Sequence, residues 1–307
     1  GRDSIGALVT ILLVVVLVLL LRLGGLGWFA AVCHSFTTMA TGGFSTRTAS
    51  VAAFDSAYVE AVLTVFMLLA GINFSLHYRL LRGEGAAWWK DGELRFYLGI
   101  FALFAAVGTW VLHGVRAPAG LGWGGAFREV AFTGASLMTT TGFATGDYDR
   151  WPLALKPLLV LLMLLGGCAG STAGGIKVGR IQVMLKAVVR EIRLFMQPQA
   201  VIPVKAGRKP LEDELLLSIL GFVLLYLFVL LLGVLALVPF VPDCRTAFSA
   251  VVACLSNVGP GFAGVGPTQN YAALPAAGHA ILSELIVVGR LDLYTVLAIF
   301  MPAFWRK

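Results

Sequence analysis

The feature that most limits how this chain can fold is a polar, threonine- and glycine-rich stretch that directly follows an apolar segment too short to cross a bilayer. The stretch is 139–142 (Thr-Thr-Thr-Gly), the apolar segment is 126–138, and a wet aromatic turn and a long apolar run follow. Non-helical backbone is tolerated at membrane depth only where it is buried in protein or lines a water-filled cavity. Glycine permits backbone conformations closed to other residues, so the carbonyls of such a strand can point toward one axis and replace the hydration shell of a cation.

The same pattern occurs three times. Segment 28–40 leads into a glycine-bearing strand at 41–47, and segment 245–255 leads into another at 256–266. Aligned on Gly42, Gly142 and Gly259, the strands are separated by 100 and 117 residues, a period far longer than that of a soluble solenoid. Each unit is predicted to contain a spanning helix, a short helix, a strand and a second spanning helix. Three unrelated re-entrant loops are the alternative, and they leave the recurrence to chance.

Composition places the chain among all-α integral membrane proteins. Hydrophobic residues make up 59% of it and charged residues 13%, against about a quarter charged in ordinary globular domains. Its four cysteines lack paired spacing and its four histidines are scattered, which argues against a disulfide framework or a metal cluster. With no catalytic constellation visible, we expect a protein that is not an enzyme, holds no covalent cofactor and binds no nucleic acid.

The chain divides into three units and a linker. The units are predicted at 1–80, 94–196 and 214–307, and a polar linker of mixed charge covers 197–213. Apolar runs of spanning length predict the helices, since about twenty apolar residues cross a bilayer. The runs lie at 5–21, 54–73, 96–113, 215–238 and 275–300.

The second helix of the middle unit is interrupted by glycines. Apolar segment 153–165 ends in a run with five glycines in ten residues, and helix resumes over 176–196. Each glycine weakens a helix by about 1 kcal/mol, and broken helices at membrane depth are typical of transporters and channels. A close helix-packing surface of small residues is the alternative. The neighbouring polar residues favour a mobile gating loop beneath the strands, formed by Gly166, Gly167, Gly170, Ser171, Thr172, Gly174, Gly175 and Lys177.

The distribution of basic residues predicts orientation. Fourteen lysines and arginines fall on one side of the predicted helices and five on the other, which places the first side, with the C-terminus, in the cytoplasm. The short helices then enter from outside, and their C-terminal ends, which carry partial negative charge, favour a cation at the pore centre. The cytoplasmic set is Arg79, Arg82, Lys90, Arg95, Lys177, Arg180, Lys186, Arg190, Arg193, Lys205, Arg208, Lys209, Arg306 and Lys307.

Arg290 lies in an otherwise apolar helix. A charge at that depth costs about 3 kcal/mol and normally has a functional partner. Asp292, two residues along the helix, faces away and is a poor partner; a structural pair with Glu284 or a snorkelling side chain is the alternative. We expect Arg290 to be a fixed positive charge beneath the strands that lowers cation occupancy or holds the glycine loop.

These motifs resemble those of the Trk/Ktr/HKT superfamily of potassium transporters, most closely the membrane subunit of bacterial Trk systems. The matching segments are 40–46, 139–143, 257–261, the Gly-Gly-Cys-Ala-Gly-Ser-Thr-Ala-Gly-Gly-Ile-Lys run at 166–177 and Gly-Arg-Leu-Asp at 289–292. The resemblance implies potassium uptake through a pseudo-fourfold pore, with a gating loop at 166–175 and Arg290 near it. It implies K⁺ bound along filter positions Ala40, Thr41, Gly42, Gly43, Thr140, Thr141, Gly142, Phe143, Asn257, Val258, Gly259 and Pro260.

The resemblance also implies partners. It predicts a homodimer in the bacterial inner membrane in which each protomer has its own pore. A cytoplasmic ring of nucleotide-binding regulatory subunits would dock on the basic segments at 177–209, so that a nucleotide acts only through that partner.

One departure from the family pattern concerns the number of units. The family has four pore units and this chain shows three, starting at Gly1 where the second would begin. We therefore expect a fragment that does not transport alone. A cation-coupled secondary transporter of another substrate and a non-transporting membrane scaffold remain open. The first would show inverted halves, and the second leaves the repeated strands without a purpose.

Overall fold

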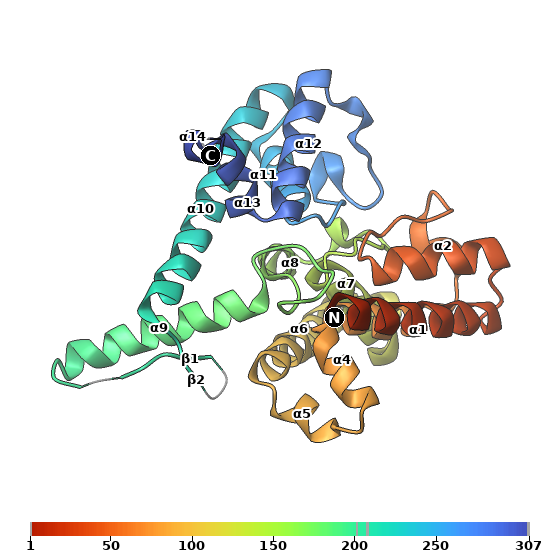
Figure 1. Ribbon diagram of the computed structural model, residues 1–307. Helices are drawn as coiled ribbons and strands as arrows, with labels where there is room; N and C mark the ends of the chain where they lie inside the picture. Colours follow the sequence, from red (N-terminus) through yellow and green to blue (C-terminus); the bar gives the residue numbers. More distant parts are fainter. Residues whose placement is uncertain (1, 201, 207–208, 306–307) are drawn as a thin grey trace.

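The computed structural model describes residues 2–200, 202–206 and 209–305. The predicted all-α membrane fold is confirmed, with three repeats arranged around a common centre (Figure 1). The first repeat contains α1 (Arg2–Leu23), α2 (Trp28–Met39), α3 (Ala57–Ala70) and α4 (Phe74–Leu81), and α5 (Gly85–Lys90) follows it. Gly1, Arg208, Arg306 and Lys307, which entered the predictions above, lie outside the described residues.

The middle repeat contains α6 (Gly92–Arg116), α7 (Trp123–Met138), α8 (Lys156–Leu165) and α9 (Val178–Met196). The linker forms a small antiparallel hairpin of β1 (Lys205–Ala206) and β2 (Lys209–Pro210). The last repeat contains α10 (Asp213–Leu237), α11 (Cys244–Leu255), α12 (Ala276–Leu291) and α13 (Leu293–Phe300), with the short α14 (Pro302–Trp305) at the end. Short 3₁₀ helices cover Ser50–Phe54, Ala117–Ala119, Tyr148–Arg150, Leu153–Leu155, Val238–Phe240, Ala263–Val265 and Tyr271–Ala273.

Two helices of the described chain, Gly92–Ala119 and Asp213–Phe240, are long and apolar enough to cross a membrane, and α3 with α4 form a third span if the bent pair is counted as one. The bounds predicted for the helix at 54–73 are wrong, because α3 covers only Ala57–Ala70. Helix α3 ends at Ala70, and α4 leaves it at 101° after a short break. The Asn73 side chain accepts from the Ser75 amide and so starts the new helix.

The continuous helix predicted at 275–300 is also wrong, because it breaks between α12 and α13. Asp292 has φ +73°, a left-handed conformation that no helix interior accepts. Its carboxylate accepts from Arg180 of α9 at 2.9 Å, and this contact stabilises the break. In every repeat, the helical segment that follows the strand is therefore divided in two: α3 and α4 separate at 71–73, α8 and α9 at 166–177, and α12 and α13 at Asp292.

The repeats pack in chain order. Helix α3 of the first repeat packs against α7 of the middle repeat, and α8 of the middle repeat packs against α11 of the last. Three apolar clusters form the core, one for each repeat, and they include residues of neighbouring repeats, such as Phe143 in the first cluster and Ile72 in the middle one. The first is centred on Leu63 and Met67, the middle one on Leu159 and Met163, and the last on Val251 and Leu255. This arrangement brings the C-terminal ends of α2, α7 and α11, and the strands that follow them, to the centre.

Asp149 connects two repeats on the side where the short helices begin. Its carboxylate accepts from Lys156 at 2.9 Å and from Arg245 of the last repeat at 2.6 Å, and its second oxygen accepts from the Ala263 amide at 3.2 Å. Partial burial raises the pKa of Asp149, but the hydrogen bond and charge of Lys156, with the Ala263 amide and Arg245, outweigh it, so that the pKa lies below its usual value.

We expect Asp149→Asn to lower stability by about 1–3 kcal/mol, since three donors lose a charged acceptor. A depressed carboxyl pKa contributes stability that is complete above the unfolded pKa, near 4, and is lost as pH falls through the folded pKa. Thermal unfolding in detergent should therefore show a lower Tm for Asp149→Asn at pH 7, and a difference that narrows in acid. Glu84→Gln, which breaks the exposed Arg79–Glu84 pair, is the control. Equal Tm values for Asp149→Asn and the unmodified chain would contradict the prediction.

Candidate ion-conduction site

The three strands share one backbone pattern. In each strand the first and third residues have positive φ and the residue between them does not: Thr41 (51°) and Gly43 (64°), Thr140 (55°) and Gly142 (84°), Asn257 (61°) and Gly259 (100°). In each, the amides of the second and third residues donate to one carbonyl of the preceding short helix, that of Thr37, Ser136 or Ala253. The strands are thus equivalent position by position.

This equivalence corrects the predicted register by one residue. The counterpart of Gly142 and Gly259 is Gly43, whereas Gly42 is the counterpart of Thr141 and Val258. The sequence agrees with this correction at the first two strands, since Gly43 precedes Phe44 as Gly142 precedes Phe143. The choice follows from which amide meets the helix carbonyl and which residue has positive φ.

Neighbouring strands are in close contact. A Cβ atom added at Gly43 would meet the carbonyl oxygen of Thr141, and one added at Gly142 would meet the carbonyl oxygen of Val258. At Gly259 such an atom would have no described heavy atom within 4 Å. The strands therefore follow one another in chain order around the centre, and the side beyond Gly259 is open.

An open cavity of about 530 Å³ lies between the last strand and the first. It is lined by Ala40, Thr41 and Gly42 on one side and by Asn257, Val258 and Gly259 on the other, with Arg290 at its edge. Six of the twelve predicted filter residues therefore face one space.

The outer ends of the strands are held by side chains. The Ser136 hydroxyl donates to the Phe143 carbonyl at 2.7 Å, and the Thr37 hydroxyl donates to the equivalent Phe44 carbonyl at 2.9 Å. The last repeat has Ala253 at this position, and Tyr148 of the middle repeat donates to the Pro260 carbonyl instead, at 3.2 Å. The Phe143 ring is buried and stacks on His34. Phe143 and Pro260 therefore anchor the strands through protein contacts.

Tyr271 is a residue that sequence reasoning missed. Its hydroxyl donates to the Gly259 carbonyl at 2.6 Å, on the open side of the last strand. Tyr271 lies outside every repeated motif, so no pattern in the sequence pointed to it.

The glycine loop lies directly against the inner ends of all three strands. The Thr172 hydroxyl donates to the Met39 carbonyl at 2.9 Å, and the Thr41 hydroxyl donates to the Thr172 carbonyl at 2.9 Å. The Gly174 amide donates to the Thr140 hydroxyl at 2.6 Å. A Cβ added at Gly174 would meet the Ser256 carbonyl oxygen, so only glycine permits this approach to the last strand.

The loop is also tied to the surrounding helices. The Ala169 amide donates to the Glu93 carboxylate at 2.7 Å, and the Phe74 amide donates to the Gly170 carbonyl at 3.1 Å. The Lys177 ammonium donates to the Ala173 carbonyl. Glu93 was not predicted as a site residue, and it fixes the loop to the start of α6. All eight predicted loop residues lie in or next to this connected segment.

Arg290 bridges the loop and the first strand. Its guanidinium donates to the Thr172 carbonyl at 3.1 Å and to the Ala40 carbonyl at 3.2 Å. It borders both the 530 Å³ cavity and a second cavity of about 270 Å³ that the loop lines together with Lys177, Arg180 and Asp292. Arg290 and the loop therefore separate two spaces. The helix that carries Arg290, α12, approaches the end of α11 closely, and this requires Gly289, because a Cβ there would meet the Leu255 carbonyl oxygen.

Comparison with known proteins gives consistent matches over nearly the whole chain. A family model described as TrkH, cation transport protein, matches residues 5–307. The Trk system potassium uptake protein TrkH of Escherichia coli K12 is 38% identical over 98% of this chain and 62% of its own length. TrkG of the same organism is 32% identical over 93% of this chain and 58% of its own length. The crystal structure of the potassium transporter TrkH from Vibrio parahaemolyticus superposes with a TM-score of 0.89, at 34% identity, over 96% of this chain and 63% of that one.

Proposed function

Because this chain belongs to the TrkH family of cation transport proteins, we propose that it forms most of the wall of a potassium uptake pathway across the bacterial inner membrane. The observation that carries the proposal is the shared backbone of the three strands, with left-handed residues at equivalent first and third positions. Alternation of this kind turns successive carbonyls toward one side, where they can replace the water around a cation. The E. coli and Vibrio relatives, which are named for potassium, support K⁺ as the transported ion.

The ion-binding positions proposed are those at the inner and central parts of the strands. They are Ala40, Thr41, Gly42 and Gly43, then Thr140, Thr141 and Gly142, then Asn257, Val258 and Gly259, while Phe143 and Pro260 act as anchors. The ends of α2, α7 and α11 meet this region and contribute partial negative charge. Cation selectivity therefore has two sources, the strand carbonyls and the helix ends.

We infer that the segment 166–175 gates the pathway with Arg290. Support comes from the hydrogen bonds that join Thr172 and Gly174 to the strands, and from the two carbonyls that Arg290 bridges. A segment joined to every strand beneath the pathway blocks it while those contacts last. Displacement of the loop would open it.

A fourth wall is required on the open side beside Gly259. The chain spans 62% of the length of the E. coli relative, which leaves room in that protein for another unit. We propose that 1–80, 94–196 and 214–307 are three pore units, that 197–213 is a cytoplasmic linker, and that a fourth strand-bearing unit lines the 530 Å³ cavity.

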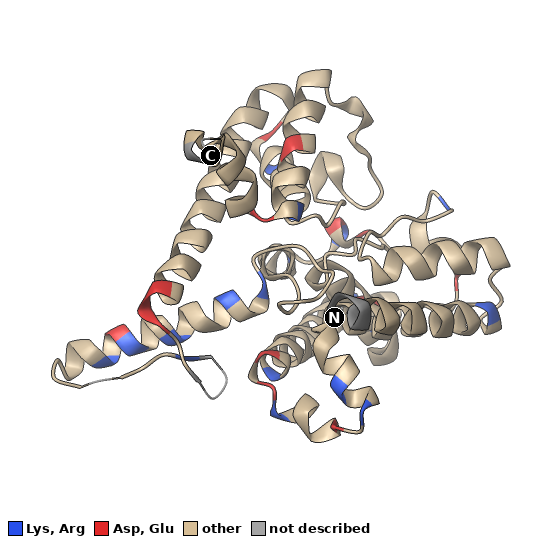
Figure 2. Ribbon diagram, viewed as in Figure 1, with Lys and Arg blue, Asp and Glu red and all other residues tan. Residues whose placement is uncertain are grey.

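We further propose a homodimer with its C-terminus in the cytoplasm, regulated by a ring of nucleotide-binding subunits. The basic helix α9 and the hairpin after it, within the segment 177–209, offer the docking surface, and Figure 2 shows the positive residues gathered along α9. The phrase "Trk system" in the relatives' names supports a multicomponent assembly.

The test is growth of a bacterium deficient in potassium uptake, at limiting potassium. The host would express this chain joined to the part of E. coli TrkH outside the matched region. We expect growth and rubidium uptake that exceed those of a host expressing the added part alone. Absence of rescue, with the joined protein present in the membrane and the host's regulatory subunit intact, would overturn the proposal.

A further inference from the structure

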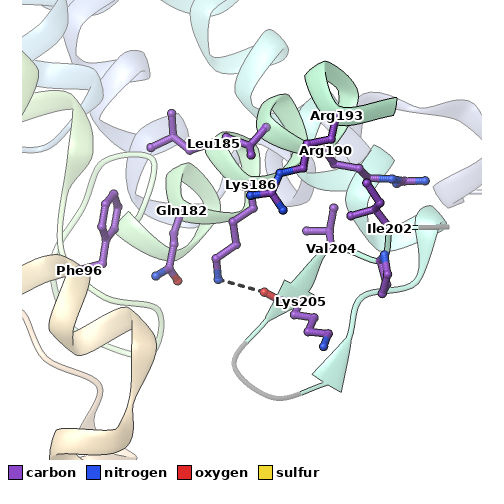
Figure 3. A pocket seen from close by; sticks show the side chains of 11 residues that line it. Phe96, Gln182, Leu185, Lys186, Arg190, Arg193, Ile202, Val204 and Lys205 are labelled. Carbon is purple, nitrogen blue, oxygen red and sulfur yellow. Dashed lines mark hydrogen bonds between the residues drawn. The ribbon is translucent and has the colours of Figure 1, made fainter. Parts of the chain in front are cut away.

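A cavity of about 660 Å³ lies beside α9, along the face between Gln182 and Arg193, away from the strands and the glycine loop. One wall is α9, another is the segment 202–205, and Phe96 of α6 closes the side (Figure 3). Among the described residues, its lining carries four cationic side chains and no carboxylate: Lys186, Arg190, Arg193 and Lys205. Between them lie aliphatic side chains, including Leu185, Val189 and Ile202.

The cations come from one helix face and from the linker. Lys186, Arg190 and Arg193 are spaced four and three residues apart, which places them on the same side of α9. Lys186 donates to the Lys205 carbonyl at 3.0 Å, and this bond holds the linker against the helix (Figure 3). A backbone contact, with no acidic partner for Lys186 among the described residues, leaves its charge uncompensated.

Arg190 carries an unpaired donor. One terminal nitrogen donates to Asp213 at 3.2 Å, but its Nε atom is buried without a hydrogen-bond partner among the described residues. A buried N–H without an acceptor costs about 1–3 kcal/mol. An anionic oxygen bound in this positively charged cavity could accept a hydrogen bond from Arg190 Nε and satisfy it.

The cavity lies at the level where two spanning helices begin. Phe96 is in the first turns of α6, Arg190 contacts the first residue of α10, and Gln182 donates to the carbonyl of Gly92, where the α6 span starts. The boundary between bilayer and water therefore passes through this region. Two aliphatic residues of α9 that line the cavity, Leu185 and Val189, are 47% and 46% exposed, which fits contact with acyl chains.

We propose that this cavity binds the phosphodiester of an anionic phospholipid, with its glycerol and acyl chains against the aliphatic residues of α9. Basic pockets on the cytoplasmic side of membrane proteins hold such headgroups. Basic and aliphatic side chains alternate within one small concavity, which matches a molecule that is anionic at one end and apolar at the other. The regulatory subunits proposed above would contact the exposed face of α9 and leave this concavity to the lipid, because Lys186 and Arg190 are only partly exposed.

The lipid would fix the α9–linker unit to the membrane surface. Helix α9 follows the glycine loop directly, and Arg180 on it holds Asp292 at the break between α12 and α13. A lipid bound beside α9 would therefore affect the position of the glycine loop and of the break between α12 and α13, which both lie next to the proposed gate. Lipid binding does not depend on the proposed potassium transport; it requires only that the chain lies in a membrane.

The test uses the purified chain in detergent, with native mass spectrometry of added phosphatidylglycerol and phosphatidylcholine. We expect preferential retention of phosphatidylglycerol, weakened roughly 30-fold in Arg190→Gln/Arg193→Gln, since each basic residue contributes about a factor of five. The matched control is Arg82→Gln/Lys90→Gln, which removes two exposed charges of the same predicted side away from the cavity and should retain the lipid. Arg193→Gln alone changes an exposed residue without touching the Asp213 pair, and a loss of roughly fivefold is expected.

Excess inorganic phosphate distinguishes the two sources of the anion. Retention of phosphatidylglycerol in excess phosphate supports the lipid, and its complete displacement by phosphate overturns it. Equal loss of lipid in the control and cavity variants, or equal retention of the two lipids by the unmodified chain, also overturns the proposal.

Discussion

Replacing Gly142 with alanine is expected to reduce potassium uptake by more than tenfold in the joined protein described above. Gly142 has φ +84°, where a residue with a Cβ costs about 1–2 kcal/mol. The added Cβ would also meet the Val258 carbonyl oxygen, and it would lie 3.0 Å from the Pro260 ring. The middle and last strands must separate to admit it. Because we propose that both strands present carbonyls to the ion, we expect this displacement to change ion binding as well as stability.

Two other glycines separate the causes. Gly146 has no described atom within 4 Å of an added Cβ and lacks a positive φ, so Gly146→Ala should leave uptake near that of the unmodified protein. Gly259 has φ +100° and no described atom within 4 Å of an added Cβ, so Gly259→Ala in the chain alone tests backbone strain without a clash and should lower the Tm less than Gly142→Ala does. Rubidium uptake and the potassium-to-sodium ratio are measured at matched membrane expression. Equal uptake by Gly142→Ala and Gly146→Ala would remove Gly142 from the pathway.

The repeated units could be predicted from sequence because their signals are local. A short apolar segment followed by threonine and glycine predicts a short helix that ends at a strand. The three short helices, α2, α7 and α11, and the strands after them lie where this pattern predicts them. The register at Gly42 and Gly43 was predicted wrongly by one residue, although Gly43 precedes Phe44 as Gly142 precedes Phe143. The amide hydrogen bonds to the Thr37 carbonyl decide it, and they exist only in the folded chain.

The broken helices show the limit of hydropathy. Segment 275–300 is apolar enough to predict a continuous span, yet it breaks at Asp292, and the helix predicted at 54–73 already ends at Ala70. At the first break the Gly71 carbonyl accepts from the Cys168 amide of the glycine loop, and at the second Asp292 accepts from Arg180. Tyr148 and Glu93 were missed because each contacts a backbone group far away in the sequence, and Tyr271 was missed because it lies outside the repeated motifs.

Replacing Arg290 with glutamine is expected to raise potassium uptake several-fold. Arg290 donates to the carbonyls of Thr172 and Ala40, so it joins the glycine loop to the first strand in the arrangement that we propose is closed. Hydrogen bonds from charged groups contribute about 1.5–3 kcal/mol, and a loss of even 1 kcal/mol shifts the closed-to-open ratio roughly fivefold. Glutamine also removes the positive charge that borders both cavities. Rubidium influx by the joined protein measures the result, and Arg150→Gln, which changes an exposed arginine paired with Asp147, is the control.

Arg290→Lys distinguishes a bridge from a charge barrier. Lysine keeps the charge, but its single ammonium lacks the planar fork that lets a guanidinium reach two carbonyls at once. If Arg290 acts by joining the loop to the strand, Arg290→Lys should raise uptake nearly as much as Arg290→Gln, and the amides of 169–175 should exchange hydrogen faster in both. If charge alone limits flux, Arg290→Lys should behave as the unmodified protein does. The two carbonyl bonds favour the first outcome. A fall in uptake in Arg290→Gln, with the protein folded and in the membrane, would contradict both roles.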